Sequence, residues 1–229
     1  MRTQPNRTLS APPPGALLNE SLTALELPRL LLQAPRLVRA TRGTGQRVLV
    51  LPGYGADDSS TALIRGYLRF LGYRPAGWGL GRNDADVLAL LERLRSRVAA
   101  LAEEGPIRLV GWSLGGYLAR EVARDCPEAV GRVVTLGSPV VGGPKYTSVA
   151  RLFAGLDDIE ALVDARYATP LTVPVTAVYS RLDGVVSWQA CIDDRSPNVE
   201  HVEVSTTHIG LGFSPEVLRI IADRCAQPD

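Results

Sequence analysis

Residues 108–120 read RLVGWSLGGYLAR, and this stretch joins a strand pattern directly to a helix pattern. Ile107 to Val110 is a short run of β-formers, which predicts a buried strand. Apolar residues then recur at a helical spacing of four, at Leu114, Leu118, Val122 and Cys126. Between the two lies Gly-Trp-Ser-Leu-Gly at 111–115, which fits the pattern G-x-S-x-G of a tight turn from a strand into a helix.

Such a turn predicts a nucleophilic serine at position 113. The glycines let the chain turn so tightly that the Ser113 hydroxyl stands clear of the sheet. The helix begins directly behind it, so the backbone N–H of Leu114 points at any oxyanion that forms beside this hydroxyl. The alternative is a glycine-rich turn whose serine only caps the helix.

A serine nucleophile needs a base, and histidine is the usual one. The chain has two histidines. His201 lies inside the last strand pattern, where alternation with Val202 and Val204 places it on a face of the sheet. His208 lies just beyond that strand, at the carboxyl end where catalytic groups of open α/β sheets gather. We therefore predict His208 as the base, against the alternative of a loop histidine with no role.

The acid that orients this histidine should also follow a strand. Asp183 comes after the strand pattern at 173–179 and sits in a turn that Gly184 ends. It is our predicted acid. The alternatives are a plain turn aspartate at this position, or an acid later in the chain at Asp193 or Asp194.

Several short motifs between residues 48 and 225 together resemble the α/β-hydrolase superfamily, and within it the bacterial lipase and esterase group. They are Leu51-Pro52-Gly53-Tyr54-Gly55, the turn at 111–116, Leu136-Gly137-Ser138-Pro139, the turn at 179–184 and Thr207-His208. The order serine, aspartate, histidine agrees with this superfamily. Two departures from the lipase pattern are Pro52 and Val140, which stand where those relatives often have histidine.

The resemblance implies a serine hydrolase with a catalytic triad of Ser113, Asp183 and His208. It also implies an oxyanion hole made by the backbone N–H groups of Tyr54 and Leu114. The expected substrate is a small-molecule carboxylic ester of an apolar acyl group. No metal and no organic cofactor is implied. There are two alternatives. One is an acyl thioesterase, because the turn with tryptophan at position 112 also resembles that of thioesterases, and the other is a catalytically silent binding protein on the same fold.

Strand patterns alternate with helix patterns along most of the chain, which predicts a doubly wound, mostly parallel sheet of about six strands with helices on both faces. The resemblance implies that this arrangement is a compact α/β-hydrolase fold. The strand patterns lie at 47–51, 73–78, 107–110, 132–136, 173–179 and 199–204, and the helix patterns at 63–71, 87–101, 114–126 and 215–225.

Two further segments complete the predicted organisation of a hydrolase domain at 41–229. Residues 1–40 read as a polar mobile arm to position 16, followed by two short leucine-rich helices over 17–38. The arginines among these leucines leave a membrane-surface segment as an alternative. Residues 140–171 form a cap-like insertion with an apolar helical face near 150–162, which either packs as core or roofs the acyl pocket.

The composition of the chain disfavours several other classes of function. The chain of 229 residues has 25 basic and 24 acidic side chains and no basic stripe, which disfavours nucleic-acid binding. No stretch is long and apolar enough for a transmembrane helix or the core of a secretory signal, so we expect a cytoplasmic protein, with secretion left open. The three cysteines are expected as free thiols, and the oligomeric state stays undetermined.

Overall fold

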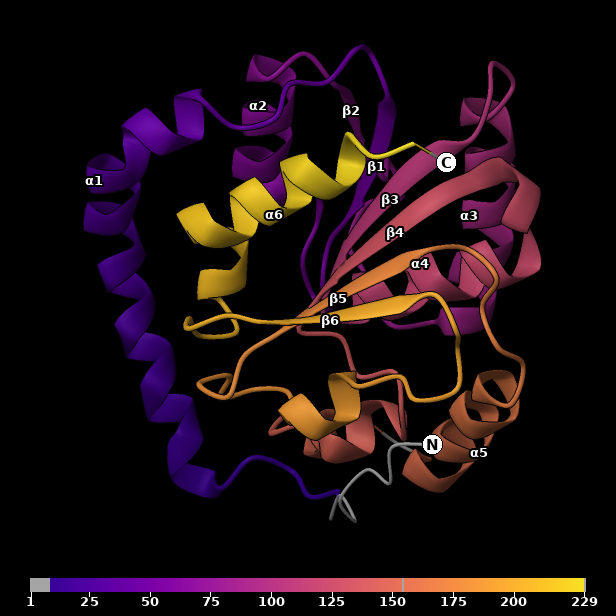
Figure 1. The fold of residues 1–229 in the computed structure, drawn as a ribbon. Coiled ribbons are helices and arrows are strands. Elements are labelled where there is room, and N and C mark those ends of the chain that lie inside the picture. Colours follow the sequence, from indigo (N-terminus) through magenta and orange to yellow (C-terminus); the bar gives the residue numbers. More distant parts are fainter. Residues whose placement is uncertain (1–8, 154, 229) are drawn as a thin grey trace.

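The computed structural model describes residues 9–153 and 155–228. In these residues six parallel strands form one sheet in the order β2-β1-β3-β4-β5-β6 (Figure 1). Their bounds are β1 Arg47–Leu51, β2 Arg74–Gly77, β3 Ile107–Trp112, β4 Val130–Leu136, β5 Val175–Tyr179 and β6 Val199–Glu203. The predicted fold class, a doubly wound parallel sheet of about six strands, is confirmed.

The helices lie on both sides of this sheet. They are η1 Pro14–Leu25, α1 Glu26–Val38, α2 Ala62–Phe70, α3 Val87–Leu101, α4 Leu114–Asp125, α5 Leu156–Tyr167 and α6 Pro215–Cys225. Short 3₁₀ turns are η2 Asp58–Thr61, η3 Pro127–Ala129, η4 Gly143–Tyr146, η5 Ala150–Leu152, η6 Trp188–Cys191 and η7 Gly210–Gly212. Strand β2 is shorter than predicted, because the backbone N–H of Trp78 donates to the Asp58 carboxylate (2.8 Å) instead of extending the sheet.

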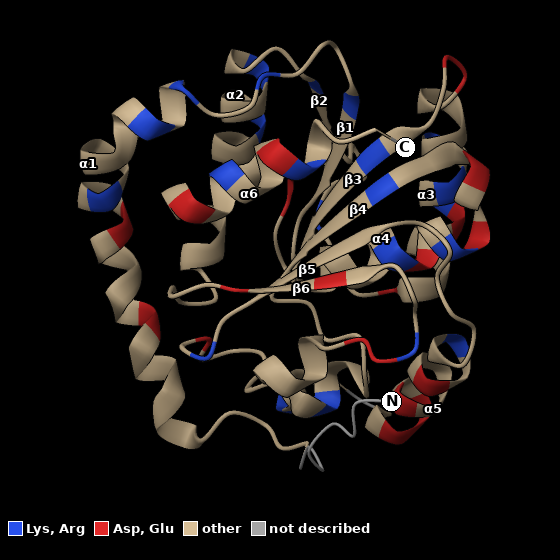
Figure 2. Cartoon of the chain, viewed as in Figure 1, with Lys and Arg blue, Asp and Glu red and all other residues tan. Residues whose placement is uncertain are grey.

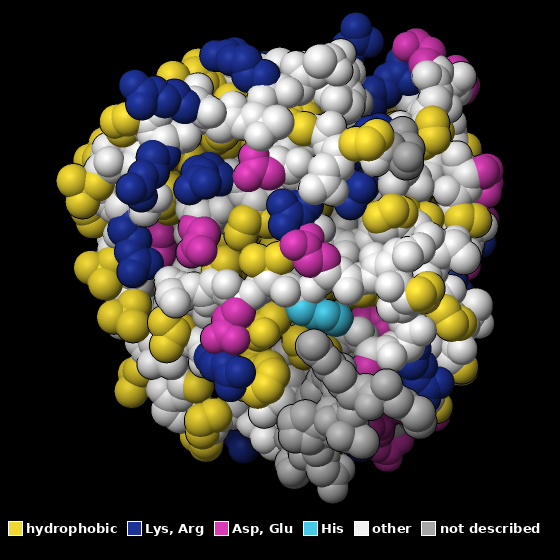
Figure 3. All heavy atoms as spheres, viewed as in Figure 1, with side chains coloured by type: hydrophobic (Ala, Val, Ile, Leu, Met, Phe, Trp, Pro, Cys, Tyr) yellow, Lys and Arg dark blue, Asp and Glu magenta, His cyan; other side chains and the backbone are white. Residues whose placement is uncertain are grey.

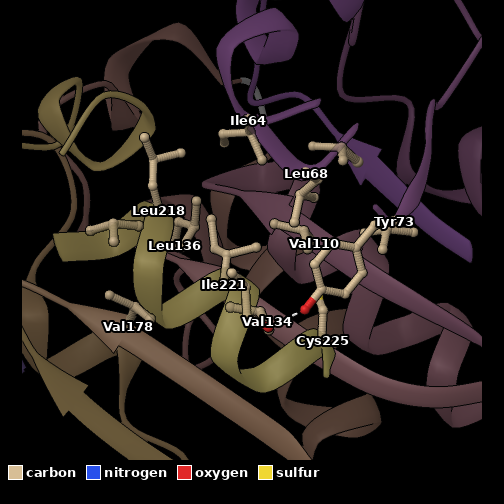
Figure 4. Close-up of a cluster of buried hydrophobic side chains, with 14 of the residues drawn as sticks. Ile64, Leu68, Tyr73, Val110, Val134, Leu136, Val178, Leu218, Ile221 and Cys225 are labelled. Atoms are coloured by element: carbon tan, nitrogen blue, oxygen red, sulfur yellow. Dashed lines mark hydrogen bonds between the residues drawn. The ribbon is translucent and has the colours of Figure 1, made fainter. Parts of the chain in front are cut away.

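Alternating side chains of the central strands enter two separate cores. Val48 and Val50 face the core formed with α2 and α6, whereas Leu49 and Leu51 face the core formed with α3 and α4. Figure 4 shows the first core, where side chains of α2 and α6 meet Val110 and other strand residues. Because both faces are covered, the central strands β3 and β4 are mostly apolar, apart from Arg108 and Arg132 near their amino-terminal ends and Thr135 in β4.

Helices η1 and α1 run end to end along one side of the molecule, beside α6, and are called here the N-terminal strap, residues 14–38 (Figure 1). The strap begins at Pro14, so the predicted arm is three residues too long, and the first eight residues of that arm lie outside the described ranges. Pro35 lies inside α1 and does not end it.

The outer face of the N-terminal strap is apolar and cationic. Leu18, Leu31 and Leu32 are 78%, 73% and 82% exposed. Figure 3 shows hydrophobic and basic side chains side by side along this edge. Membrane-surface contact by this segment stays a prediction. Among the described residues, no helix is long and apolar enough to cross a bilayer.

The chain between β4 and β5 holds η4, η5 and α5. One helix near 150–162 is predicted, but the structure divides it into η5 and α5, because Gly155 adopts the left-handed conformation (φ 64°) at the α5 N-cap. Acidic residues of α5 lie on its outer surface (Figure 2), and Ile159 and Val163 face inward.

Candidate active site

Ser113 occupies a strained turn between β3 and α4. Its backbone angles are φ 54° and ψ −123°, a conformation that non-glycine residues rarely adopt. A side chain on Gly111 would collide with the backbone of Gly115 and Gly116, so this glycine is required for the first turn of α4 to pass so close to the strand. The turn is the one predicted from G-x-S-x-G, with the serine at its apex.

Three predicted residues follow the carboxyl ends of their strands and therefore lie along one edge of the sheet. Ser113 comes directly after β3, Asp183 four residues after β5, and His208 five residues after β6. Trp112 joins the serine turn to the histidine loop: its indole N–H donates to the His208 carbonyl oxygen (3.1 Å), and the two rings lie 6.4 Å apart.

The structure brings Asp183 and His208 into direct contact. The distance from His208 Nδ1 to Asp183 Oδ2 is 2.7 Å. The second carboxylate oxygen, Oδ1, accepts the backbone N–H groups of Val185 (2.8 Å) and Val186 (2.7 Å). Because a carboxylate only accepts hydrogen bonds, Nδ1 carries the proton and Nε2 is left as an acceptor.

Burial and charge act on His208 in opposite directions. Burial alone would lower the pKa of His208. The neighbouring Asp183 carboxylate and its hydrogen bond raise it, with a smaller contribution from Glu20, so that the pKa lies above its usual value of 6.5. This arrangement favours the imidazolium form that a general base adopts after accepting a proton.

The alternative residues serve other contacts. His201 Nε2 accepts the backbone N–H of Asp193 (3.0 Å) from within β6. Asp193 forms a buried ion pair with Arg120, and Asp194 accepts the Tyr167 hydroxyl (2.7 Å). Asp183 and His208 are the candidate acid and base whose side chains hydrogen-bond each other directly.

Tyr54 and Leu114, the predicted oxyanion-hole residues, both line the cavity that Ser113 faces. Tyr54 lies in the loop after β1 and Leu114 is the first residue of α4. Both residues therefore lie at the same cavity as Ser113, and their role as oxyanion-hole donors stays a prediction.

This cavity has a volume of about 240 Å³ and a mostly apolar lining. The segment between β4 and β5 contributes part of its wall, with side chains that include Val149, Phe153, Ile159, Leu162 and Val163. The Phe153 ring packs on Tyr54, with centroids 4.9 Å apart. The segment predicted to be cap-like therefore contacts the predicted oxyanion loop directly.

A sequence profile of the alpha/beta hydrolase family matches residues 19–224. The chain belongs to the alpha/beta hydrolase family. This hydrolase is 40% identical over 101 residues to a pimeloyl-[acyl-carrier protein] methyl ester esterase of Sodalis glossinidius; the match covers 43% of this chain and 39% of the esterase. The chain thus spans about two fifths of that relative's length.

Solved structures share the fold of this alpha/beta hydrolase. Lipase B of Aspergillus fumigatus superimposes with a TM-score of 0.61 at 16% identity, over 80% of this chain and 53% of the lipase. An alpha/beta superfamily hydrolase of Oenococcus oeni gives 0.60 at 15% identity, over 81% of this chain and 94% of its own. At these identities the likeness concerns the fold.

Two residues near the site of this hydrolase were not predicted. Asn83 is fully buried: its side-chain N–H₂ donates to the Pro52 carbonyl (3.0 Å), and its backbone carbonyl accepts the Gly55 N–H (2.7 Å), so it shapes the Tyr54 loop. Glu20 contacts the loops of Asp183 and His208. Neither belongs to a motif, and each reaches the site from elsewhere in the chain.

Among the described residues, no three His, Cys, Asp or Glu side chains are grouped closely enough to hold a metal ion. The three cysteines are free thiols, as expected from the sequence: Cys126 is half-buried, and Cys191 and Cys225 are buried.

Proposed function

We propose that this alpha/beta hydrolase cleaves carboxylic esters of apolar acyl groups, with Ser113 as nucleophile, His208 as base and Asp183 as orienting acid. One observation carries the proposal: the Asp183–His208 contact of 2.7 Å lies at the sheet edge where a strained serine faces an apolar cavity. The esterase activity in the name of the Sodalis relative supports the same reaction class.

The reaction follows from the roles of these groups. The Ser113 hydroxyl attacks the ester carbonyl carbon and gives its proton to His208 Nε2. The tetrahedral oxyanion is stabilised by the backbone N–H groups of Tyr54 and Leu114. The alcohol leaves with the proton from Nε2, and an acyl-serine remains. Water, deprotonated by His208, then attacks the acyl carbon; the bond to the Ser113 oxygen breaks, this oxygen takes the proton back from His208, and the acid is released.

The cavity defines the acyl group that the site accepts. At about 240 Å³ it is slightly smaller than the usual range for ligand pockets, roughly 300–1,000 Å³. We therefore expect short or medium acyl chains. Phe153, placed against Tyr54 at the cavity wall, is the side chain expected to set the upper length.

The test combines a fluorophosphonate probe with a series of nitrophenyl esters from acetate to dodecanoate. Labelling of the wild type but not of Ser113→Ala, together with ester turnover, supports the proposal. Faster turnover of acyl-CoA than of any ester would favour the thioesterase alternative. An unlabelled wild type without turnover would refute the proposal and favour a catalytically silent protein.

A further inference from the structure

Three backbone N–H groups beside the predicted acid and base donate to one carboxylate. Glu20 Oε1 accepts the N–H of Gly184 (2.9 Å) and the N–H of His208 (3.0 Å). Its second oxygen, Oε2, accepts the N–H of Ile209 (2.8 Å). Gly184 directly follows Asp183, so a single side chain of the N-terminal strap bridges the acid loop and the base loop.

The helix type explains how the strap reaches these loops. Helix η1 is a 3₁₀ helix with three residues per turn, so Glu20, Thr23 and the adjoining Glu26 lie on one face. Thr23 hydrogen-bonds the Thr207 hydroxyl (2.5 Å), and Glu26 accepts the hydroxyl of Thr206 (2.7 Å). The face therefore follows the chain that leads into His208.

The strap also packs tightly on the acid loop. A side chain at Gly184 would collide with the backbone carbonyl of Ala16, at the start of η1. Glycine at this position therefore allows the backbone of the acid loop to lie against the strap, within reach of the Glu20 carboxylate.

We propose that Glu20 is a positioning residue for the triad: by binding both loops it holds Asp183 and His208 at the separation that proton transfer from Ser113 requires. The inference rests on the proposed function. Asp183 and His208 are carried by separate loops after β5 and β6, so their contact depends on how these loops lie relative to each other. Misplacement by about 1 Å can reduce turnover about 10²-fold.

Glu20 also adds negative charge beside the base. The charged groups that act on His208 are Asp183 from the loop after β5 and Glu20 from the strap, and both raise the pKa of His208. A neutral residue at position 20 removes one of these charges, so the pKa of His208 falls and the acid limb of the pH–rate profile moves to lower pH.

The decisive variants are Glu20→Gln and Glu20→Asp, with Glu26→Gln as the matched control. Glu20 uses both oxygens as acceptors, so an amide places an N–H₂ group against an N–H donor. Glu26 Oε2 has no hydrogen-bond partner, so glutamine at 26 keeps the bonds of Oε1 to Thr206 and Arg29. The control therefore removes a carboxylate from the same strap and keeps its hydrogen bonds, while the ion pair with Arg29 becomes a hydrogen bond to a neutral amide.

We expect Glu20→Gln to lower kcat for a nitrophenyl ester about 10- to 100-fold, with KM changed less than about twofold and the acid limb shifted to lower pH. Glu20→Asp keeps the charge but is one methylene shorter, so kcat falls while the acid limb stays in place. Glu26→Gln should keep kcat within about twofold. If the glutamine variant does not fold, the loss of kcat in the aspartate variant tests the positioning role instead.

A Glu20→Gln enzyme that folds and keeps its kcat overturns the inference, and so does an equal kcat loss in Glu26→Gln. Ser113→Ala is measured in parallel to separate the two proposals. If Ser113→Ala retains turnover, the proposed function itself fails; if only the Glu20 variants match the wild type, the positioning role fails and the triad stands.

Discussion

Replacing Asp183 by asparagine tests the triad most directly, because the structure determines which way the new amide must point. Asp183 Oδ1 accepts two backbone N–H groups, from Val185 and Val186. Turning the amide over would place its N–H₂ against both donors and lose two hydrogen bonds, each worth about 1 kcal/mol. The amide oxygen therefore stays on these donors, and the N–H₂ group faces His208 Nδ1.

With the amide in this orientation, His208 adopts the tautomer that cannot act as a base. Nδ1 of His208 must now accept a hydrogen bond, so the proton moves to Nε2, which can no longer take the proton of Ser113. The loss in kcat expected for this change is about 10⁴-fold, equivalent to about 5.4 kcal/mol of transition-state stabilisation. Loss of the Asp183 charge also lowers the pKa of His208, so the acid limb of the residual activity moves to lower pH.

The assay is steady-state hydrolysis of a short nitrophenyl ester by wild type, Asp183→Asn and Asp194→Asn, with thermal unfolding of each. Asp194 is an exposed aspartate that bonds Tyr167, and its amide variant should keep nearly full activity. A loss below about tenfold for Asp183→Asn in a folded enzyme would refute the reasoning, as would a larger loss for Asp194→Asn.

Four further outcomes are expected. Ser113→Ala should lower ester turnover by about 10⁴-fold or more and leave thermal unfolding unchanged, as measured by kinetics and circular dichroism. His208→Ala should be nearly as damaging and His201→Ala should retain most activity; the reverse result would exchange their roles. Wild-type kcat/KM should fall at acidic pH with a midpoint above 6.5, since the pKa of His208 is raised and only the neutral imidazole is a base. Phe153→Ala should shift the preferred ester length and spare acetate, whereas an unchanged length profile would assign this side chain to the core.

Structural features that depend on residues close together in the sequence could be predicted from it. Each predicted strand and each helix from 63 onward has a counterpart, because apolar periodicity over five to fifteen residues reports which faces are buried. Positions 113, 183 and 208 could be selected because each follows a strand pattern, and parallel strands end at one edge. Asn83 could not be selected in this way, because its partner Pro52 lies 31 residues earlier and no pattern in the sequence around Asn83 indicates the contact.

The N-terminal strap shows why some long-range contacts stay hidden. Glu20, Thr23, Glu26 and Arg29 repeat every three residues, and all four contact the loops after β5 or β6. A search for periods of 3.6 and 2 does not register this spacing. Between Glu20 and Thr23 it matches one turn of the 3₁₀ helix η1, and Glu26 and Arg29 continue the repeat into α1, where residues three apart are also neighbours. A 3₁₀ helix seldom exceeds four residues, but here η1 extends over twelve. Such a helix gains little from its own hydrogen bonds, so its length depends on what its polar face binds. We therefore infer that η1 stays helical over this length because its polar residues bind the loops that carry Asp183 and His208.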